Sequence, residues 1–184
     1  VLERGEVIEA LSQARDAGKT RFIGYSGDNE AAQWAVDSGH FDTLQTSFNL
    51  ADQRPRNGLL QRAKQNGLGV IAKRPIANTA WGSPTSPTAL KKHTPEYGDE
   101  YWRRTQAMAA LGPIDIPLND RILMSLGFVM AHEEIDTAIV GTRNPEHLKS
   151  NIDLFNSKLP IDRSIVTELY RRWNELDDNW IGQI

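Results

Sequence analysis

Residues 136–155, DTAIVGTRNPEHLKSNIDLF, decide the fold of this chain. Residues 137–140 form an apolar, partly β-branched run that is too short for a helix and stops at Gly141, as expected for a strand covered on both faces. Asn144 is suited to cap a following helix, and Pro145 to its first position, where the missing N–H would have had no partner. The stretch therefore predicts a buried strand, a glycine turn and a helix.

The start of this predicted helix is suited to bind an anion. Free backbone N–H groups and the helix dipole make a helix N-terminus positive, and a phosphate is a natural ligand there. Arg143 stands next to these groups and could pair with a phosphate. An ordinary strand-to-helix turn with a solvated Arg143 explains the same residues equally well, so both interpretations stay open at this point.

Composition excludes several classes of protein. The 184 residues suffice for one domain with a core, and the formal net charge of −3 gives no basic surface for nucleic acid. No run approaches the roughly eighteen apolar residues of a membrane helix. The absence of cysteine excludes disulfides and thiolate metal sites and is compatible with the cytoplasmic location that we expect. Because the chain begins at Val1 in helix-like sequence, we interpret residues 1–184 as a single partial domain.

Strands and helices alternate along the chain. Expected strands are residues 22–26, with Phe22 and Ile23 buried, 41–49, 69–75 and 136–140. Expected helices are residues 6–17, 30–36 after a cap at Asp28, 58–64, 97–111, 119–131, the helix that follows Asn144, and a terminal helix capped by Asp162. The apolar helix 119–131 is expected to pack against the sheet rather than bind a partner. A polar loop, residues 76–99, carries Trp81 as a packing residue.

This alternation predicts an α/β fold with parallel strands and right-handed crossovers. Four strand-helix units are half of the eight in a (β/α)₈ TIM-type barrel. A flavodoxin-like open sheet is the alternative, but it usually carries its phosphate loop in the first unit. Here the best phosphate turn, at Gly141, lies in the last unit, where barrels commonly bind phosphate. We therefore expect half of a barrel.

The chain carries four expected strand ends in this order: RFIGYS, LQTSFN, GVIAKRP and TAIVGTRNPEHLKSNI. With them, the chain resembles the carboxy-terminal half of an aldo-keto reductase, strands five to eight of the barrel, over essentially its whole length. The resemblance implies an NADP(H)-dependent oxidoreductase that moves hydride between nicotinamide and a small carbonyl or alcohol substrate. The catalytic aspartate, tyrosine, lysine and histidine of the family belong to the first four strands. We therefore assign no catalytic residue and expect the chain to be inactive by itself.

The resemblance implies a nicotinamide site at the first three strand ends. Ser26 and Gln45 match the residues that contact the carboxamide, although a glutamine satisfied by backbone in the core is the alternative for Gln45. Gly27 replaces the usual asparagine. Lys73 replaces an aromatic residue that stacks on the ring; its stem could cover the ring, while its charge would disfavour oxidised nicotinamide. Tyr25 or Trp81 could supply an aromatic surface instead, but both are expected to be packing residues.

The phosphates of the cofactor would lie along the last two strand ends. Residues matching the pyrophosphate loop are Arg74, Pro75, Ile76 and Ala77, with Arg74 as counterion. In the last unit Gly141, Thr142 and Arg143 are expected to hold the adenosine 2′-phosphate, and Arg143 favours NADP over NAD. His147 replaces a longer donor, Ser150 replaces an acid, and Asn151 could reach the adenine.

The remaining expectations concern the histidines and two alternative functions. The histidines His40, His93, His132 and His147 show no spacing of a metal site or triad and are expected on the surface. A stand-alone nucleotide-binding or interaction module, built from half-barrels that self-associate through their open edges, is the alternative function. A third possibility is a phosphate-binding barrel of unrelated chemistry.

Overall fold

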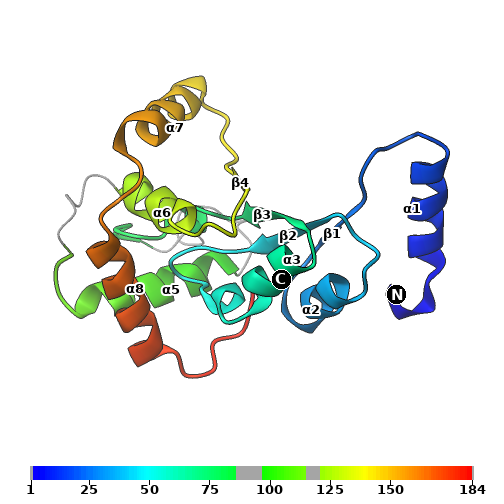
Figure 1. The fold of residues 1–184 in the computed structure, drawn as a ribbon. Helices are drawn as coiled ribbons and strands as arrows, with labels where there is room; N and C mark the ends of the chain where they lie inside the picture. Colours follow the sequence, from blue (N-terminus) through cyan, green and yellow to red (C-terminus); the bar gives the residue numbers. More distant parts are fainter. Residues whose placement is uncertain (1, 86–96, 115–120, 184) are drawn as a thin grey trace.

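The computed structural model describes residues 2–85, 97–114 and 121–183. Its centre is a sheet of four parallel strands, β1 (Gly24–Ser26), β2 (Thr43–Ser47), β3 (Gly69–Lys73) and β4 (Thr137–Ile139) (Figure 1). The strands lie side by side in the order β1-β2-β3-β4. A flavodoxin-like sheet reverses its strand order, so this consecutive order favours the barrel-type arrangement. The expected parallel α/β fold is confirmed.

Helices connect and follow the strands. Before and within the first three units lie η1 (Leu2–Arg4), α1 (Glu6–Asp16), α2 (Asn29–Asp37), η2 (Arg54–Arg56), α3 (Leu59–Gln65) and η3 (Ala77–Thr79). The later helices are α5 (Tyr97–Ala110), α6 (Arg121–Met130), α7 (Pro145–Lys158) and α8 (Arg163–Leu176). Where they are described, the helices begin and end within one or two residues of the expected positions. Residues 86–96 of the polar loop and 119–120 lie outside the described residues.

The core lies on one face of the sheet. Leu44, Val70 and Ala72 point to this face and are fully buried. They share one cluster with apolar residues from α2, α3, α5, α6 and α8, namely Val36, Leu60, Met108, Phe128 and Leu169. The packing of α6 and Trp81 was expected and is confirmed. Alternate residues of β2 and β3, including Gln45 and Ile71, are only partly buried, so the other face is more open.

Two expectations about burial at the edges of the sheet are wrong. In β4 the side chain of Ile139 is 45% exposed rather than covered on both faces, and before β1 the side chain of Phe22 is 62% exposed. Within the described chain, β1 and β4 each pair on one side only. An apolar, β-branched run predicts a strand, but its burial depends on a neighbour that these two edges lack.

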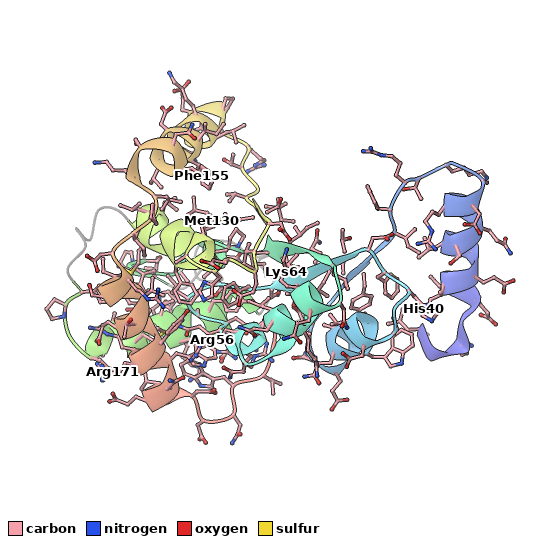
Figure 2. All side chains as sticks on the ribbon, in the orientation of Figure 1. His40, Arg56, Lys64, Met130, Phe155 and Arg171 are labelled. Carbon is pink, nitrogen blue, oxygen red and sulfur yellow. The ribbon has the colours of Figure 1, made fainter. Side chains whose placement is uncertain are left out.

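The helices that flank these edges are poorly buried as well. Figure 1 shows α1 at the right of the molecule and α7 projecting at its top. No residue of α7 is buried, and α1 buries only Ile8. Between α6, β4 and α7 runs an apolar groove of about 530 Å³, lined by Met130, Ile139, Leu148 and Phe155 among others. Met130 and Phe155 can be located on α6 and α7 in Figure 2. No helix in the described ranges is long and apolar enough to span a membrane.

Candidate functional site

The carboxyl ends of the four parallel strands meet at one edge of the sheet. Ser26 ends β1, Lys73 ends β3, and Gly141 follows β4 after one further residue. Gln45 lies opposite Ser26 in the register of β1 and β2. Parallel α/β sheets bind ligands at this edge because the loops there are free to carry function. The fold therefore places Ser26, Gln45, Lys73 and Gly141 toward one edge of the sheet.

Ser26 and Gln45 form a direct side-chain pair. The amide Nε2 of Gln45 donates to the Ser26 hydroxyl oxygen at 3.0 Å. Ser26 is exposed and Gln45 half-buried, so the bond lies at the surface rather than in the core. The Ser26 proton and the Gln45 amide oxygen are a donor and an acceptor, the two kinds of group that a primary carboxamide needs.

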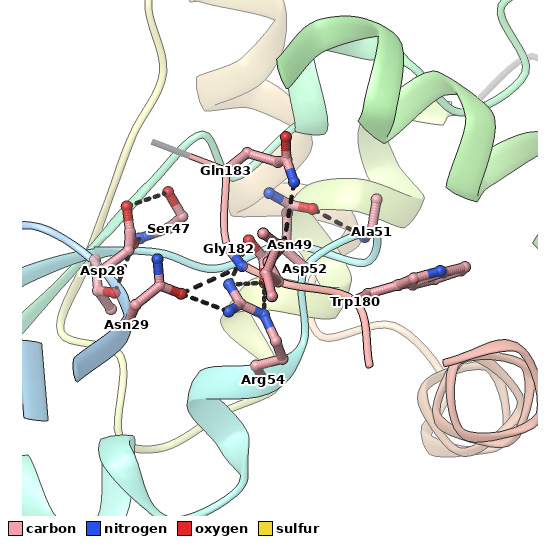
Figure 3. A network of polar contacts seen from close by, with 12 residues as sticks. Asp28, Asn29, Ser47, Asn49, Ala51, Asp52, Arg54, Trp180, Gly182 and Gln183 are labelled. Carbon is pink, nitrogen blue, oxygen red and sulfur yellow. Dashed lines mark hydrogen bonds and ion pairs between the residues drawn. The ribbon is translucent and has the colours of Figure 1, made fainter. Parts of the chain in front are cut away.

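Lys73 forms an ion pair with Asp28, a residue that was expected to have another role. The Lys73 ammonium lies 2.9 Å from Oδ2 of Asp28. Asp28 was expected to cap α2, but its side chain makes no capping bond. Its carboxylate instead accepts from the Thr46 hydroxyl at 3.0 Å, the Ser47 N–H at 2.7 Å and the Ser47 hydroxyl at 3.2 Å (Figure 3). These three donors and the Lys73 ammonium outcompete the helix end for the carboxylate.

These donors also keep Asp28 ionised. Burial by itself raises the pKa of the carboxyl group, but the Ser47 N–H and Lys73 outweigh it and the pKa falls below its ordinary value. The pair of Asp28 and Lys73 is therefore a charged pair, of which Asp28 is the buried member, its side chain 2% exposed against 19% for Lys73.

A second polar network binds the carboxy-terminal tail next to this pair (Figure 3). Arg54 donates to both oxygens of Asp52 at 2.8 and 3.1 Å through one nitrogen, and to the Asn29 side-chain oxygen at 2.7 Å. The same Asn29 oxygen accepts from the Gly182 N–H at 3.2 Å. Burial raises the pKa of Asp52, and the Arg54 charge only partly offsets this. The tail thus returns to the carboxyl end of β1.

Arg74 and its neighbours lie against this tail. The Arg74 guanidinium donates to the backbone oxygen of Gln183 at 2.5 Å. Pro75 and Ala77 are buried and Ile76 is half-buried. The side chains of Pro75 and Ala77 therefore pack in the core, and only backbone groups of these two residues could face a ligand.

The turn after β4 and the start of α7 are open. Asn144 caps α7 as expected, with its side-chain oxygen accepting from the Glu146 N–H at 3.0 Å. Thr142 contributes its hydroxyl, which accepts from the Asn144 N–H at 3.2 Å. Arg143 is exposed, and a Cβ added at Gly141 would meet nothing within 4 Å. The turn is therefore exposed at the surface.

The other two predicted residues of α7, His147 and Asn151, differ in exposure. His147 is exposed in the first turn, close to the helix N-terminus. Asn151, one turn further on, is half-buried and lines the apolar groove toward α6 and β4. Asn151 therefore lies one helical turn beyond His147, on the side of α7 that faces the groove, and its contact with the adenine remains a prediction.

The expectation of four surface histidines is wrong for His132. This residue is 7% exposed, and its ring packs edge-on against Phe48 and Phe128. Its ring nitrogens lie 2.8 Å from the Phe128 carbonyl oxygen and 2.6 Å from the Tyr170 hydroxyl. His40 and His147 are exposed, and His93 lies outside the described residues. No cluster suited to a metal ion occurs in the ranges that the structure describes.

The sequence model of the Aldo/keto reductase family matches residues 2–169. The chain belongs to this family. Its membership bears out the resemblance seen at the strand ends, and it makes the four strands about half of a (β/α)₈ barrel.

Solved structures of this family have the same fold. The chain is similar to the aldo-keto reductase AKR11C1 from Bacillus halodurans, with a TM-score of 0.70 and 17% identity for the holo form. That match covers 91% of this chain and 55% of the other. The apo form gives a TM-score of 0.69 at the same identity and covers 90% and 55%. The chain thus spans about 55% of the length of these relatives.

Two features of the site were missed in the sequence. Asp28 was taken for a helix cap because it directly precedes a helical pattern, and the tail at Gly182 carries no motif. A local signal existed for Asp28: an acid follows one strand end while a lysine, Lys73, ends another, and parallel strands bring such ends together. The hydrogen bond of Gly182 joins it to Asn29, far away in the sequence, and leaves no such signal.

Proposed function

We propose that this chain is the cofactor-binding part of an NADP(H)-dependent oxidoreductase acting on a carbonyl or alcohol carbon, and that it works in the cytoplasm. One observation carries the proposal: the Ser26–Gln45 pair and the open turn at Arg143 lie at the carboxyl ends of strands in one parallel sheet. Two such sites suit the two ends of a dinucleotide. The bound cofactor would supply or accept the hydride.

The residues present fit the nicotinamide end. Ser26 and Gln45 offer a donor and an acceptor to the carboxamide at the accessible edge of the sheet. Lys73, at the end of β3, is partly buried, so its stem is suited to lie along one face of the ring. These side chains bind and orient the ring but move no proton.

The residues after β4 fit the other end of the cofactor. At the start of α7 the N–H groups of Glu146 and His147 are already bonded to Asn144, so the helix would contribute its dipole, and Gly141 leaves space for the backbone of the turn to approach a phosphate. Thr142 and Arg143 would complete the contact with the 2′-phosphate, His147 would lie beside it, and Arg74 would serve the pyrophosphate. The additional phosphate distinguishes NADP from NAD, so Arg143 decides the preference.

No residue of this chain is assigned to proton transfer. We propose that hydride transfer requires a further part of the barrel, which would cover the edges of β1 and β4 and the apolar groove beside α7. The purified chain should accordingly bind NADPH without reducing carbonyl compounds. Turnover of a carbonyl substrate by the chain itself would contradict this.

Nucleotide binding by variants tests the proposal. Replacing Arg143 with alanine should weaken NADPH binding about tenfold or more and leave NADH binding nearly unchanged, since a charge-assisted contact is worth about 1.5–3 kcal/mol. Isothermal titration of both nucleotides measures this. Arg163→Ala, an equally exposed arginine at the start of α8, should change neither affinity. Failure of the unsubstituted chain to bind NADPH, with binding of another phosphate compound instead, would favour a phosphate-binding barrel of unrelated chemistry.

The exposed edges support a second candidate function. Unpaired edge strands with apolar neighbours such as Phe22 and Ile139 favour association. Two copies could pair β1 of one with β4 of the other and form a nucleotide-binding or interaction module. Light scattering distinguishes the candidates: a stable dimer that binds NADPH supports the module, and a monomer argues against it.

A further inference from the structure

Asp28 connects three strand ends through one carboxylate. It follows β1, accepts hydrogen bonds from Thr46 and Ser47 at the end of β2, and pairs with Lys73 at the end of β3. Its side chain is 2% exposed, so little of this pairing is screened by water. Asp28 therefore determines where the Lys73 ammonium lies.

Lys73 is close to the Ser26–Gln45 pair. In the sheet register Lys73 lies opposite Ser47, two residues beyond Gln45 on the same face of β2. Ser26 lies opposite Gln45 on the neighbouring strand. A nicotinamide ring whose carboxamide is held by Ser26 and Gln45 would thus lie within a few ångströms of the lysine side chain.

The charge of an unpaired lysine would matter at this position. Oxidised nicotinamide carries a positive charge on the ring and reduced nicotinamide is neutral there. A nearby ammonium would repel only the oxidised form, which predicts a site biased toward NADPH. In the structure, however, the Asp28 carboxylate lies 2.9 Å from that ammonium and neutralises it.

We propose that Asp28 is a positioning residue that neutralises Lys73 and thereby lets the site bind oxidised as well as reduced nicotinamide. The inference rests on the proposed function, because it concerns the same nucleotide site. It explains how a lysine can stand at this strand end without excluding the oxidised cofactor. It also means that the bias against the oxidised form, which Lys73 by itself would cause, is removed by its pairing with Asp28.

The ratio of the dissociation constants for NADP⁺ and NADPH tests the inference. Asp28→Asn keeps the shape of the side chain and removes its charge, so it should raise this ratio about tenfold. Lys73→Met keeps an apolar stem and leaves the carboxylate, so the ratio should fall. The double variant should return to within about twofold of the unsubstituted chain. Titration monitored by intrinsic tryptophan fluorescence gives each constant, and circular dichroism establishes that each variant is folded.

A structural role for Asp28 predicts a different result. Thr46→Val removes one hydrogen bond to the carboxylate without changing a charge, so it should leave the ratio unchanged. If Asp28→Asn lowers both affinities equally, or if Lys73→Met leaves the ratio unchanged, the inference is wrong and the proposed function stands. If Asp28→Asn does not fold, a fall in the ratio for Lys73→Met supports the inference. If the unsubstituted chain binds neither nucleotide, both proposals fail.

Discussion

His132 is a buried base with both ring nitrogens in hydrogen bonds. The Phe128 carbonyl can only accept, so Nδ1 carries the proton. Nε2 is then the acceptor for the Tyr170 hydroxyl. Protonation would place a hydrogen on Nε2, and Tyr170 could no longer donate to it. The buried imidazole is therefore held neutral.

This predicts a loss of stability in mild acid. Burial lowers the pKa of His132 below its ordinary value, so the unfolded chain binds a proton at a higher pH than the folded chain. The stabilising contribution is complete above the ordinary pKa of histidine, about 6.5, and is lost as the pH falls toward the folded pKa. Urea denaturation from pH 7.5 to 5.5 should therefore show a falling free energy of unfolding.

Two substitutions test whether His132 causes this pH dependence. His132→Phe keeps an aromatic ring among its neighbours and should flatten the slope. His40→Gln, at an exposed histidine, should retain the slope of the unsubstituted chain. An unchanged slope in His132→Phe would show that the pH dependence arises elsewhere.

At the scale of elements, one arginine joins α8 to the end of α5. Arg172 is 2% exposed and donates to the carbonyl oxygens of Met108 and Gly112 at 2.8 Å and of Pro113 at 3.1 Å. Its Nε donates to Glu168 at 2.7 Å. Carbonyl groups at a helix end have no partner within the helix, so the planar guanidinium satisfies several of them together. Arg104 on α5 has a similar role toward the tail, donating to the Ile181 carbonyl oxygen at 2.8 Å.

Replacement of Arg172 by lysine should destabilise the fold by about 2–4 kcal/mol, because an ammonium cannot reach all three carbonyl groups and leaves some of them buried and unpaired. The neighbouring Arg171 also pairs with Glu168, at 2.8 Å, but is exposed. Arg171→Lys should therefore leave the urea midpoint unchanged. Equal losses in the two variants would show that the ion pair with Glu168, rather than the carbonyl contacts, stabilises this junction.

At the scale of the whole molecule, the tail brings the end of the chain back to the first strand. A Cβ at Gly182 would lie 2.2 Å from Nη2 of Arg54 and 2.5 Å from the Asn29 side-chain oxygen. Arg54 is held by both oxygens of Asp52 and cannot easily move away. The tail therefore needs a residue without a side chain at this position.

Gly182→Ala should displace the tail and cost about 1–3 kcal/mol of stability, the usual range for overpacking a buried site. Thermal unfolding of the variant measures this loss. The adjacent Ile181 is 71% exposed, and Ile181→Ala should leave the unfolding temperature unchanged. A neutral Gly182→Ala would mean that the tail contributes little to the fold.

Features that depend on neighbouring residues were predictable. Asn144 and Asp162 cap α7 and α8 as expected, because a cap bonds an N–H only two residues away. Parallel strands and the half-barrel followed from the alternation of strands and helices. The alignment of Ser26 and Gln45 followed as well, since parallel strands place their carboxyl ends at one edge. The contacts of these residues with NADP(H) remain a prediction.

Features that depend on distant partners were decided by the tertiary structure. Asp28 bonds to β2 and β3 rather than to its own helix because four donors there, one of them a charged ammonium, surround the buried carboxylate. His132 is buried because Phe48 and Tyr170 pack around it. Residues 136–140 predict a strand whether or not another strand pairs with its outer edge. Only the sheet shows that this edge is unpaired in the described chain. Hydrogen bonds between neighbouring residues and the spacing of apolar residues can be predicted from the sequence. Burial and long-range ion pairs depend on which elements pack together in the folded protein.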